Sequence, residues 1–488
     1  MSRIQVCASL ELESYLESLR TLLGPPHERV RDLFEAGTPI CIARAPGRLD
    51  IMGGIGDYSG SLVLELPIRE AAFAAVQLTP EPGAIVVSFH EGSPEAARRI
   101  EQDALQWRNL LQRDYGQARA MLRSAPDAAW AAYAVGPVLV LCREKLRTLN
   151  CGVRILIDSR VPEGKGVSSS AALEVATMQA LASLAGLEMP GEEIARLCQM
   201  AENLVVGAPC GIMDQMTSAL GRENHLLALR CQPAIVEGHL PIPSEIAFWG
   251  IDSGIRHAVS GSDYSSVRTG AFMGYRIIAE IAGLNATSPK DSPGRVDVND
   301  DLWKGYLANV SSAEFHERFA SAVPLEMSGH EFLGRYGGIT DRVTRVDPTR
   351  TYAVRGPTLH PIEENERVER FRGLLQGHVD DRSLADMGAL MYASHDSYSA
   401  CGLGSDGTDL LVKLVREAGA KNFLYGAKIT GGGSGGTVAV LGRAEAGPAV
   451  ETIARRYTAI SGRPAYLFRG SSPGASATGV LQFKLNGQ

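Results

Sequence analysis

The sequence predicts an α+β protein with two lobes and a cleft between them. Its 488 residues are enough for two or three domains. A strand-like run at 153–157 leads through a glycine- and serine-rich loop into a helical stretch that ends at Gly186. A strand-like run followed by a glycine-rich loop recurs at 425–441. A further strand-like run at 246–251 lies between these two units and opens a second half.

In the N-terminal third we expect a helical segment, here called the preface, followed by strands. Residues 1–37 place apolar side chains at helical spacing and contain a Gly24-Pro25-Pro26 break. From 41 to 77, glycine-rich turns alternate with β-like runs such as SLVLEL at 61–66. Residues 80–127 are polar and irregular, and we interpret them as an insertion.

The middle and the C-terminal half supply the rest of the two lobes. The most apolar stretch, 128–142, is too short to span a membrane and predicts a buried helix. We place the boundary before the strand-like run at 246, which gives an N-terminal lobe of 1–245 and a C-terminal lobe of 246–488. Within the second lobe, 284–350 is rich in Ser, Pro and Asp but carries aromatic residues, which predicts a partly helical insertion.

Composition limits the class of function. Hydrophobic content of 45% with 21% charged residues is typical of a globular protein. A net charge of -7 argues against a general binder of nucleic acid or of anionic membranes. The first 19 residues have no long apolar run, and the eight cysteines form no Cys-x-x-Cys pair. We expect a cytoplasmic protein without nucleic-acid, membrane or zinc partners, and the sequence leaves its oligomeric state open.

The loop VPEGKGVSSSAALEVA at 161–176 predicts a phosphate cradle. Glycine lets a backbone approach a ligand, and a helix start offers unpaired N–H groups to an anion. Lys165 is followed by Gly166, so this is not a Walker A loop. The alternative is an ordinary flexible loop, which local sequence alone favours.

Two further glycine-rich motifs place this loop in a family. ARAPGRLDIMGGIGDY at 43–58 precedes it and KITGGGSGGT at 428–437 follows it. In this order and separation, the three motifs resemble the signatures of the GHMP kinases. The resemblance implies two α+β lobes, of which the first is similar to domain 2 of ribosomal protein S5 and the second is ferredoxin-like. It also implies ATP and Mg²⁺ as cofactors and places the ATP loop and a catalytic aspartate in the first lobe.

Two intervening stretches narrow the resemblance to the galactokinase-like branch. AENLVVGAPCGIMDQ at 201–215 resembles the segment that carries the catalytic aspartate, and DSGIRHAVSGSDY at 252–264 resembles a stretch that lines the sugar pocket. The chain from about 41 to 481 is similar to the kinase domain of plant L-arabinokinases. The implied reaction is phosphoryl transfer from ATP to the anomeric hydroxyl of a small-molecule sugar.

The resemblance carries roles to individual residues. Asp214 matches the general base, and Arg48 matches the arginine near the transferred phosphoryl group. The alternatives are an aspartate that starts a helix and a surface arginine beside a turn. Ser170 and Glu202 match the Mg²⁺ ligands, with a helix N-cap and a solvated helix face as their alternatives.

The same resemblance assigns residues to the two ends of the expected site. Asp57 matches the aspartate that accepts hydrogen bonds from sugar hydroxyls, and Cys210, Gly211 and Tyr264 match other sugar-pocket positions. For Tyr264 a half-buried core tyrosine is the alternative. The ATP phosphates are expected at Gly164, Gly166, Ser168, Ser169 and Ser170. The glycines of the third motif, 431–436, are expected to pack closely beside the nucleotide or the sugar.

One departure bears on the substrate. Galactokinases usually carry Gly-Glu-His-Thr-Asp-Tyr in the first motif, where this chain has GGIGDY at 53–58. The missing Glu-His pair reaches the C6 hydroxyl of galactose in galactokinases, and L-arabinopyranose lacks that hydroxymethyl group. The first hypothesis is therefore an L-arabinose 1-kinase in which Ile55 fills the vacated volume. Galactokinase or a broad sugar 1-kinase is the alternative, and a non-catalytic sensor that binds ATP and sugar is the alternative from another class.

Overall fold

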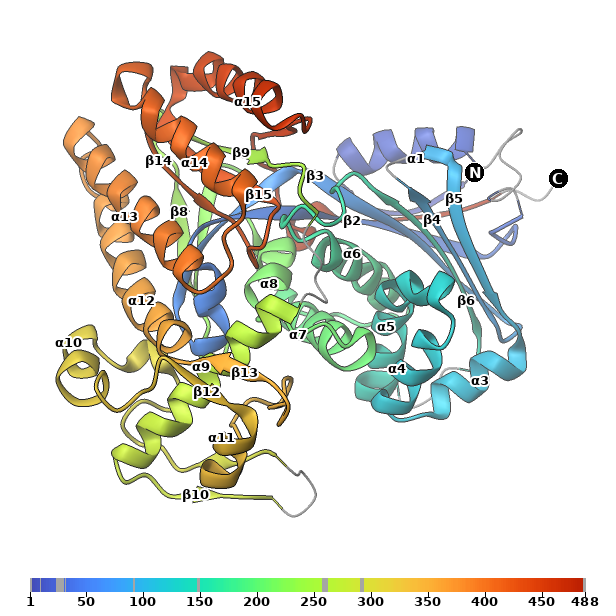
Figure 1. The fold of residues 1–488 in the computed structure, drawn as a ribbon. Helices are drawn as coiled ribbons and strands as arrows, with labels where there is room; N and C mark the ends of the chain where they lie inside the picture. The colour runs from blue at the N-terminus through green and yellow to red at the C-terminus, as the bar shows by residue number, and fades with distance from the viewer. Residues whose placement is uncertain are drawn as a thin grey trace.

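The computed structural model describes residues 2–8, 10–22, 30, 32–90, 93–146, 150–256, 262–289 and 294–485. Figure 1 shows two large sheets with helices packed around them and a third, smaller body below the second sheet. The chain is an α+β protein, as the sequence predicts. No helix within the described ranges is long and apolar enough to cross a membrane.

The larger sheet has nine strands, and a strand from the C-terminal end of the chain lies inside it. The order is β1-β17-β2-β3-β6-β4-β5, and β7 pairs with β3 and with β8. β4 and β6 run parallel, and the other neighbours are antiparallel. The bounds are β1 Ser2–Ala8, β2 Pro39–Met52, β3 Leu62–Thr79, β4 Ala84–His90, β5 Ser93–Gln102, β6 Gly152–Ser159, β7 His225–Arg230, β8 Ile235–Pro241 and β17 Gly479–Lys484.

Helices cover both faces of this sheet. On one face the apolar side chains of β2, β3 and β6 form a continuous core with six helices. These are α3 Ala104–Gln112, α4 Tyr115–Arg123, α5 Ala132–Leu141, α6 Ser169–Leu184, α7 Gly191–Met200 and α8 Met213–Leu220. On the other face α1, Leu10–Leu22, stacks Tyr15 on Phe73 of β3 at 4.3 Å between ring centroids. Every residue of α5 except Tyr133 is buried, as predicted for the apolar stretch.

The second sheet is antiparallel, with the order β14-β15-β9-β16. One face packs on α14 and α15, and the other joins α12, α13 and residues of β2 and β3 in a shared core. The bounds are β9 Ile246–Asp252, β14 Leu424–Ile429, β15 Thr437–Arg443, β16 Leu467–Arg469, α12 Arg355–Gln376, α13 Asp381–Ala400, α14 Asp406–Ala418 and α15 Gly447–Ser461.

The stretch 284–350 folds as a small body against α9, Ser262–Ile281. Its aromatic residues Trp303, Phe315 and Phe319 are buried in a core of their own, as expected for a folded insertion. Its elements are β10 Ala286–Thr287, β11 Asp297–Val298, α10 Ser312–Glu314, β12 Glu326–Ser328 and α11 Gly329–Tyr336, and β13 Thr351–Ala353 follows it.

Two expectations from the sequence are wrong. Residues 80–127 are not irregular, because they form β4, β5, α3 and α4. The charged residues of this stretch give it a loop-like composition, yet Trp107 of α3 within it is fully buried. The preface is helical only in part, because β1 precedes α1 and pairs with β17 at the far end of the chain. The expected break at 24–26 lies outside the described residues.

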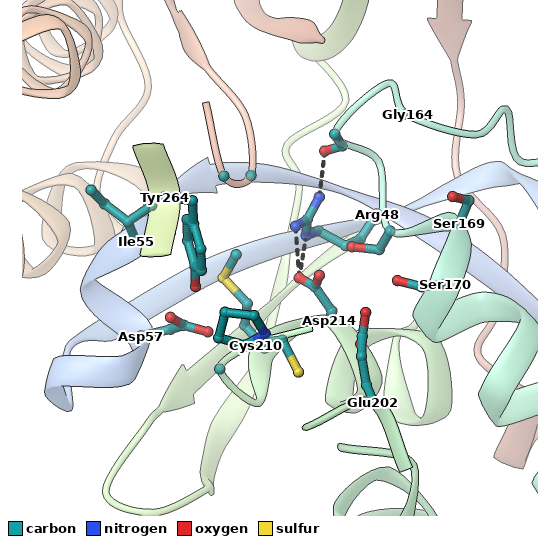
Figure 2. A pocket seen from close by; sticks show the side chains of 17 residues that line it. Arg48, Ile55, Asp57, Gly164, Ser169, Ser170, Glu202, Cys210, Asp214 and Tyr264 are labelled. Carbon is teal, nitrogen blue, oxygen red and sulfur yellow. Dashed lines mark hydrogen bonds and ion pairs between the residues drawn. The ribbon is translucent and has the colours of Figure 1, made fainter. Parts of the chain in front are cut away.

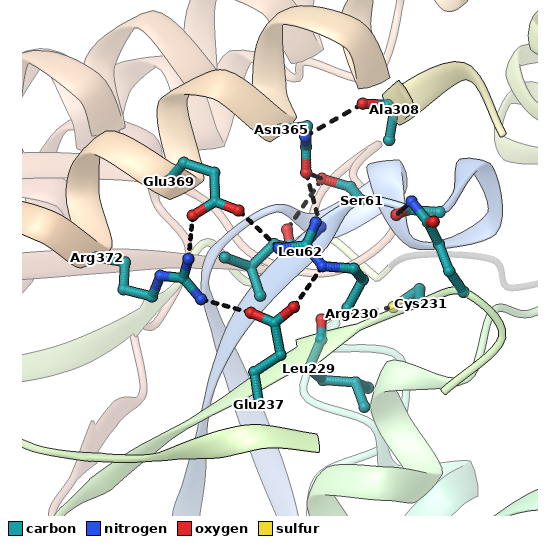
Figure 3. Close-up of polar contacts among 12 residues, drawn as sticks. Ser61, Leu62, Leu229, Arg230, Cys231, Glu237, Ala308, Asn365, Glu369 and Arg372 are labelled. Carbon is teal, nitrogen blue, oxygen red and sulfur yellow. Dashed lines mark hydrogen bonds and ion pairs between the residues drawn. The ribbon is translucent and has the colours of Figure 1, made fainter. Parts of the chain in front are cut away.

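The division of the chain near residue 245 stays a prediction. The second sheet begins at β9, but β17 returns to the first sheet and pairs with β2. Figure 3 shows polar contacts that also join the two parts: Arg230 and Glu237 of the β7–β8 hairpin form ion pairs with Glu369 and Arg372 of α12. Asn365 of α12 accepts a hydrogen bond from the Leu62 N–H at 2.9 Å. The two parts are therefore held together along an extended interface.

Candidate active site

The residues that the sequence predicts for the functional site line one cavity. It has an empty volume of about 680 Å³, including the solvent at its mouth. All twelve predicted residues line it: Arg48, Asp57, Gly164, Gly166, Ser168, Ser169, Ser170, Glu202, Cys210, Gly211, Asp214 and Tyr264. Ile55, Pro209, Met213, Gly431 and Gly432 complete the lining. Figure 2 shows Asp57 and Tyr264 at one end, Ser169 and Ser170 at the other, and Arg48 and Asp214 between them.

Five segments distant in sequence supply these residues. Arg48 lies on β2, and Ile55 and Asp57 lie on a 3₁₀ turn at Gly54–Ser59 directly after β2. The loop between β6 and α6 supplies the second motif, and Asp214 lies in the first turn of α8. Tyr264 comes from α9 and Gly431 from the loop between β14 and β15. Because both sheets contribute, the cavity lies at their junction.

Arg48 and Asp214 form the central ion pair. Arg48 Nη2 lies 2.6 Å from Asp214 Oδ1, and Nε donates to the same oxygen at 2.9 Å. Nη1 donates to the Gly166 carbonyl at 2.7 Å, which fixes the guanidinium against the second motif. Glu65 Oε2 lies 3.2 Å from Arg48 Nε. Burial alone lowers the pKa of Arg48, but the Asp214, Glu65 and Asp50 carboxylates more than reverse this and raise it. The guanidinium is therefore charged at any relevant pH.

The second motif forms the loop that leads from β6 into the start of α6. Gly164 and Gly166 adopt φ of +72° and +70°, which glycine accepts at little cost. Ser168 also has a positive φ, of 59°, although it is not glycine. Its hydroxyl oxygen is buried, has no hydrogen-bond partner and belongs to the cavity lining. A helix N-terminus with an unpaired hydroxyl beside it fits the phosphate groups of a nucleotide.

The third motif packs directly on the second. A Cβ atom at Gly431 would lie 2.7 Å from the Gly166 carbonyl, and one at Gly436 would lie 2.7 Å from the Lys165 carbonyl. The glycines of the third motif are thus required by close backbone contact. Lys165 itself forms an ion pair with Asp252, with Nζ 2.5 Å from Oδ2, and does not line the cavity.

Glu202 and Ser170 lie side by side at the end of the cavity that the second motif lines. Glu202 is buried, and burial together with the nearby Asp214 charge raises its pKa to about 7, although hydrogen bonds from Ser170, Cys210 and Gln215 oppose the rise. Gln215 Nε2 donates to Glu202 Oε2 at 2.6 Å. The described part of the chain has no cluster of three or more His, Cys, Asp or Glu residues that could hold a metal. One hydroxyl and one carboxylate instead fit Mg²⁺, which keeps waters and takes phosphate oxygens as its other ligands.

Asp57 is the polar group at the other end. It is 4% exposed, and its Oδ1 has no hydrogen-bond partner. Burial and the Asp214 charge raise its pKa to about 7, against the opposing effect of Arg268. A Cβ atom at Gly211 would lie 1.5 Å from Asp57 Oδ2, so a side chain at that position would have to displace the Asp57 carboxylate. A buried carboxylate with a free acceptor is suited to bind sugar hydroxyls.

The structure answers the alternative interpretations of single residues. Arg48 and Glu202 are 2% exposed, so neither lies on a solvated surface. Ser168, not Ser170, is at the N-cap of α6, and its side chain makes no capping bond there. Asp214 does lie in the first turn of α8. That position is compatible with both of its interpretations.

Arg268 was missed by the sequence analysis. Its guanidinium binds Asp341 through two hydrogen bonds of 2.8 and 2.9 Å and donates to the Cys210 carbonyl at 3.0 Å. It thereby connects the small body at 284–350 to the end of the cavity that Cys210 lines. The only signal in the sequence is its spacing, four residues after Tyr264 on a helix, which places both on one face.

Three family profiles match parts of this chain. The profile described as "GHMP kinases N terminal domain" matches residues 132–222. The profile described as "Galactokinase galactose-binding signature" matches 31–78, and that described as "GHMP kinases C terminal" matches 374–459. An L-arabinokinase of Arabidopsis thaliana is 44% identical over 93% of this chain. This chain spans 47% of that protein, about half of its length.

A galactokinase of Chloroflexus aggregans is 31% identical over 83% of this chain and 85% of its own length. Among solved structures, Lactococcus lactis galactokinase in complex with galactose superposes with a TM-score of 0.68, covering 96% of this chain and all of that one at 20% identity. The L. major mevalonate kinase superposes with a TM-score of 0.51 at 16% identity, covering 89% and 96%. These structures show the same fold as this chain.

Proposed function

Because this chain belongs to the GHMP kinase family, in its galactokinase-like branch, we propose that it is an ATP-dependent sugar 1-kinase that converts L-arabinose to L-arabinose 1-phosphate. One observation carries the proposal: Asp214 and Arg48 lie paired between a cavity end suited to sugar hydroxyls and a glycine-rich helix start suited to phosphates. The Arabidopsis relative named L-arabinokinase and the loss of the Glu-His pair at positions 54 and 55 support arabinose as the substrate.

In this proposal Asp214 is the general base. A sugar hydroxyl is a poor nucleophile until its proton is accepted, and a positioned carboxylate contributes on the order of 10²–10⁴-fold to the rate. The proton of the anomeric hydroxyl passes to an Asp214 oxygen. The sugar O1 then forms a bond to the γ-phosphorus of ATP, and the bond from that phosphorus to the bridging oxygen of ADP breaks. Arg48, held by Asp214 and the Gly166 carbonyl, stabilises the charge of the transferred group.

The phosphate end holds the nucleotide through groups of the second motif. The N–H groups of Gly164, Gly166 and Ser169 and the free hydroxyl of Ser168 are the donors that the loop offers. Ser170 and Glu202 would hold Mg²⁺, which neutralises phosphate charge when it is bound. Ionised Glu202 suits that role, because a cation next to a carboxylate lowers its pKa.

The sugar end orients the substrate. Asp57 accepts hydrogen bonds from adjacent ring hydroxyls, and the wall of Tyr264, Cys210 and Gly211 closes around the ring. Ile55, which is 1% exposed, adds an apolar surface where galactokinases carry a polar side chain. An apolar wall suits a pentopyranose, because a hydroxymethyl group buried there would lose its hydrogen bonds to water.

Galactose is the second candidate substrate. The galactose-binding signature covers 31–78, which includes Asp57 and the 3₁₀ turn, and galactokinases are relatives over most of this chain. Loss of the contacts to one sugar hydroxyl is compatible with relaxed as well as with altered specificity. An apolar substitution in the pocket discriminates between two such sugars by only about 10²-fold.

The experiment is a parallel assay of ATP consumption with L-arabinose and D-galactose, with the product identified by phosphorus and proton NMR. We expect a higher kcat/KM for L-arabinose and phosphate on O1. Equal values would favour the second candidate, and ATP binding without turnover of either sugar would favour a sensor. The matched control is Asp214→Asn, which should keep sugar binding in calorimetry and lose turnover by on the order of 10²–10⁴-fold. Unchanged turnover in this variant would contradict the role of Asp214.

A further inference from the structure

The space beside Gly54 is already taken by another side chain. Gly54 has φ +40° and is buried in the 3₁₀ turn of the first motif. A Cβ atom built there would lie 1.6 Å from the hydroxyl oxygen of Tyr398 and 2.6 Å from Asp50 Oδ2. Non-bonded atoms cannot approach this closely. Any residue other than glycine at position 54 would therefore have to displace Tyr398.

Tyr398 connects the two loops that border the sugar end. It lies on α13, is fully buried and does not line the cavity itself. Its hydroxyl accepts a hydrogen bond from the Ile55 N–H at 2.8 Å and donates one to the Gly431 carbonyl at 3.1 Å. Ile55 and Gly431 both line the cavity. One hydroxyl thus fixes the first motif against the third.

The ring of Tyr398 is held from several sides. Lys428 Nζ lies 5.3 Å from the ring centroid and forms an ion pair with Asp50 at 2.5 Å, and both of these residues are fully buried. His360 packs edge-on against the ring with 5.1 Å between centroids. Ile55 belongs to the same apolar cluster as Tyr398. Such packing leaves the hydroxyl no other position without moving a buried charge pair.

We propose that Tyr398 is a positioning residue for substrate choice: its hydroxyl occupies the space of a side chain at position 54 and holds Ile55 in the cavity wall, so that the site favours a pyranose without an exocyclic hydroxymethyl group. This inference rests on the proposed function. It adds that the absence of a side chain at position 54 is enforced by a tyrosine about 340 residues later in the chain. The pair Gly54 and Tyr398 therefore acts as one determinant of specificity.

The test measures kcat and KM for L-arabinose, D-galactose and ATP in the wild type and three variants. Tyr398→Phe removes both hydrogen bonds and keeps the ring. We expect its KM for L-arabinose to rise at least fivefold, the arabinose-to-galactose ratio of kcat/KM to fall, and the KM for ATP to stay within twofold. Tyr392→Phe is the matched control, because Tyr392 lies on the same helix, under the Arg416 guanidinium and away from the cavity. It should change none of these values.

The second part of the test introduces a side chain at position 54. Gly54→Glu alone should lower the thermal midpoint strongly, because its Cβ meets the Tyr398 hydroxyl. Combining Gly54→Glu with Tyr398→Leu should recover part of that midpoint and shift the ratio of kcat/KM towards D-galactose at least tenfold. A merely structural role for Tyr398 would instead change the values for both sugars equally.

The outcomes separate the two proposals. An active wild type whose sugar ratio is unchanged in Tyr398→Phe and in the double variant would overturn this inference alone. A Gly54→Glu protein as stable as the wild type would also overturn it. A wild type that phosphorylates neither sugar would overturn the proposed function and this inference together.

Discussion

Burial and neighbouring charges together set the pKa values of the carboxyl groups Asp57 and Glu202 in the cavity. Asp57, Glu202 and Asp214 bring three carboxylates into one site, and Arg48 is the cation that lines it with them. Burial raises the pKa of Asp57 and of Glu202 to about 7, which makes both groups unusual among carboxylates at neutral pH. Arg48 and Arg268 oppose the rise at Asp57 but do not cancel it. Sites with such shifted groups are where binding and catalysis concentrate.

The shifted pKa of Asp57 predicts a pH-dependent stability of the free protein. The folded state holds the Asp57 proton up to about pH 7, whereas the unfolded chain releases it near pH 3.8. The folded state thus binds more protons between these values, so its stability decreases as the pH rises through this window. Relative to the wild type, Asp57→Asn should gain about 2 kcal/mol of unfolding free energy between pH 5 and pH 7.

Urea unfolding of both proteins at pH 5 and pH 7, without sugar or nucleotide, measures this difference. Asp381→Asn is a control, because its carboxylate is exposed and its pKa is lowered by Arg443 instead of raised. An Asp57→Asn protein whose stability difference from the wild type is the same at both pH values would contradict the shifted pKa.

At the scale of elements, close backbone contacts determine where α13 lies. Gly388 of α13 faces β14, where an added Cβ would lie 2.0 Å from the Tyr425 carbonyl. On β14, a Cβ at Gly426 would lie 2.7 Å from the Gly388 Cα. Two glycines thus let helix and strand approach each other. The same helix carries Tyr398, whose hydroxyl contacts the Ile55 N–H of the first motif.

Gly388→Ala should therefore destabilise the protein by about 1–3 kcal/mol, because backbone atoms must move to admit the methyl group. Gly373→Ala is the matched control. Gly373 lies within α12, and nothing is found within 4 Å of an added Cβ. That variant should gain about 0.5–1 kcal/mol from the higher helix propensity of alanine. Chemical denaturation of both variants measures the two effects, and equal changes in the two would contradict the close contact.

At the scale of the whole molecule, the two sheets share a core and a strand. Leu49 and Leu64 of the first sheet meet Ala439 and Phe468 of the second in one apolar cluster. β17 then returns from the second half to cover the edge of β2. The cavity lies at this junction, so its geometry depends on both parts being in place.

A fragment of residues 1–245 should not fold by itself. It lacks β17, which leaves β2 as an exposed edge, and it exposes the apolar face that packs on the second sheet. We expect an insoluble fragment, and a soluble complex when residues 246–488 are expressed with it. Solubility and circular dichroism measure the result. A fragment that is soluble and unfolds cooperatively alone would show that the lobes are independent.

Much of the site was predictable because its residues lie in short motifs. The glycine-rich loops at 43–58, 161–176 and 428–437 are local patterns, since glycine is needed wherever backbones approach closely. The strands at 153–157 and 246–251 followed from apolar runs between turn residues. β5 did not, because the charged residues of this edge strand give it the composition of a loop.

The sequence by itself determined the residue types and the order of the three motifs, and with them the family and the expected chemistry. Only the tertiary structure decided that Tyr398 fills the space at Gly54, that Arg268 joins Asp341 to the Cys210 loop, and that β17 lies between β1 and β2. The physical reason is the distance in sequence between the residues that are in contact. A motif records contacts between neighbours in the chain, whereas these contacts join segments from tens to hundreds of residues apart, and packing alone brings such segments together.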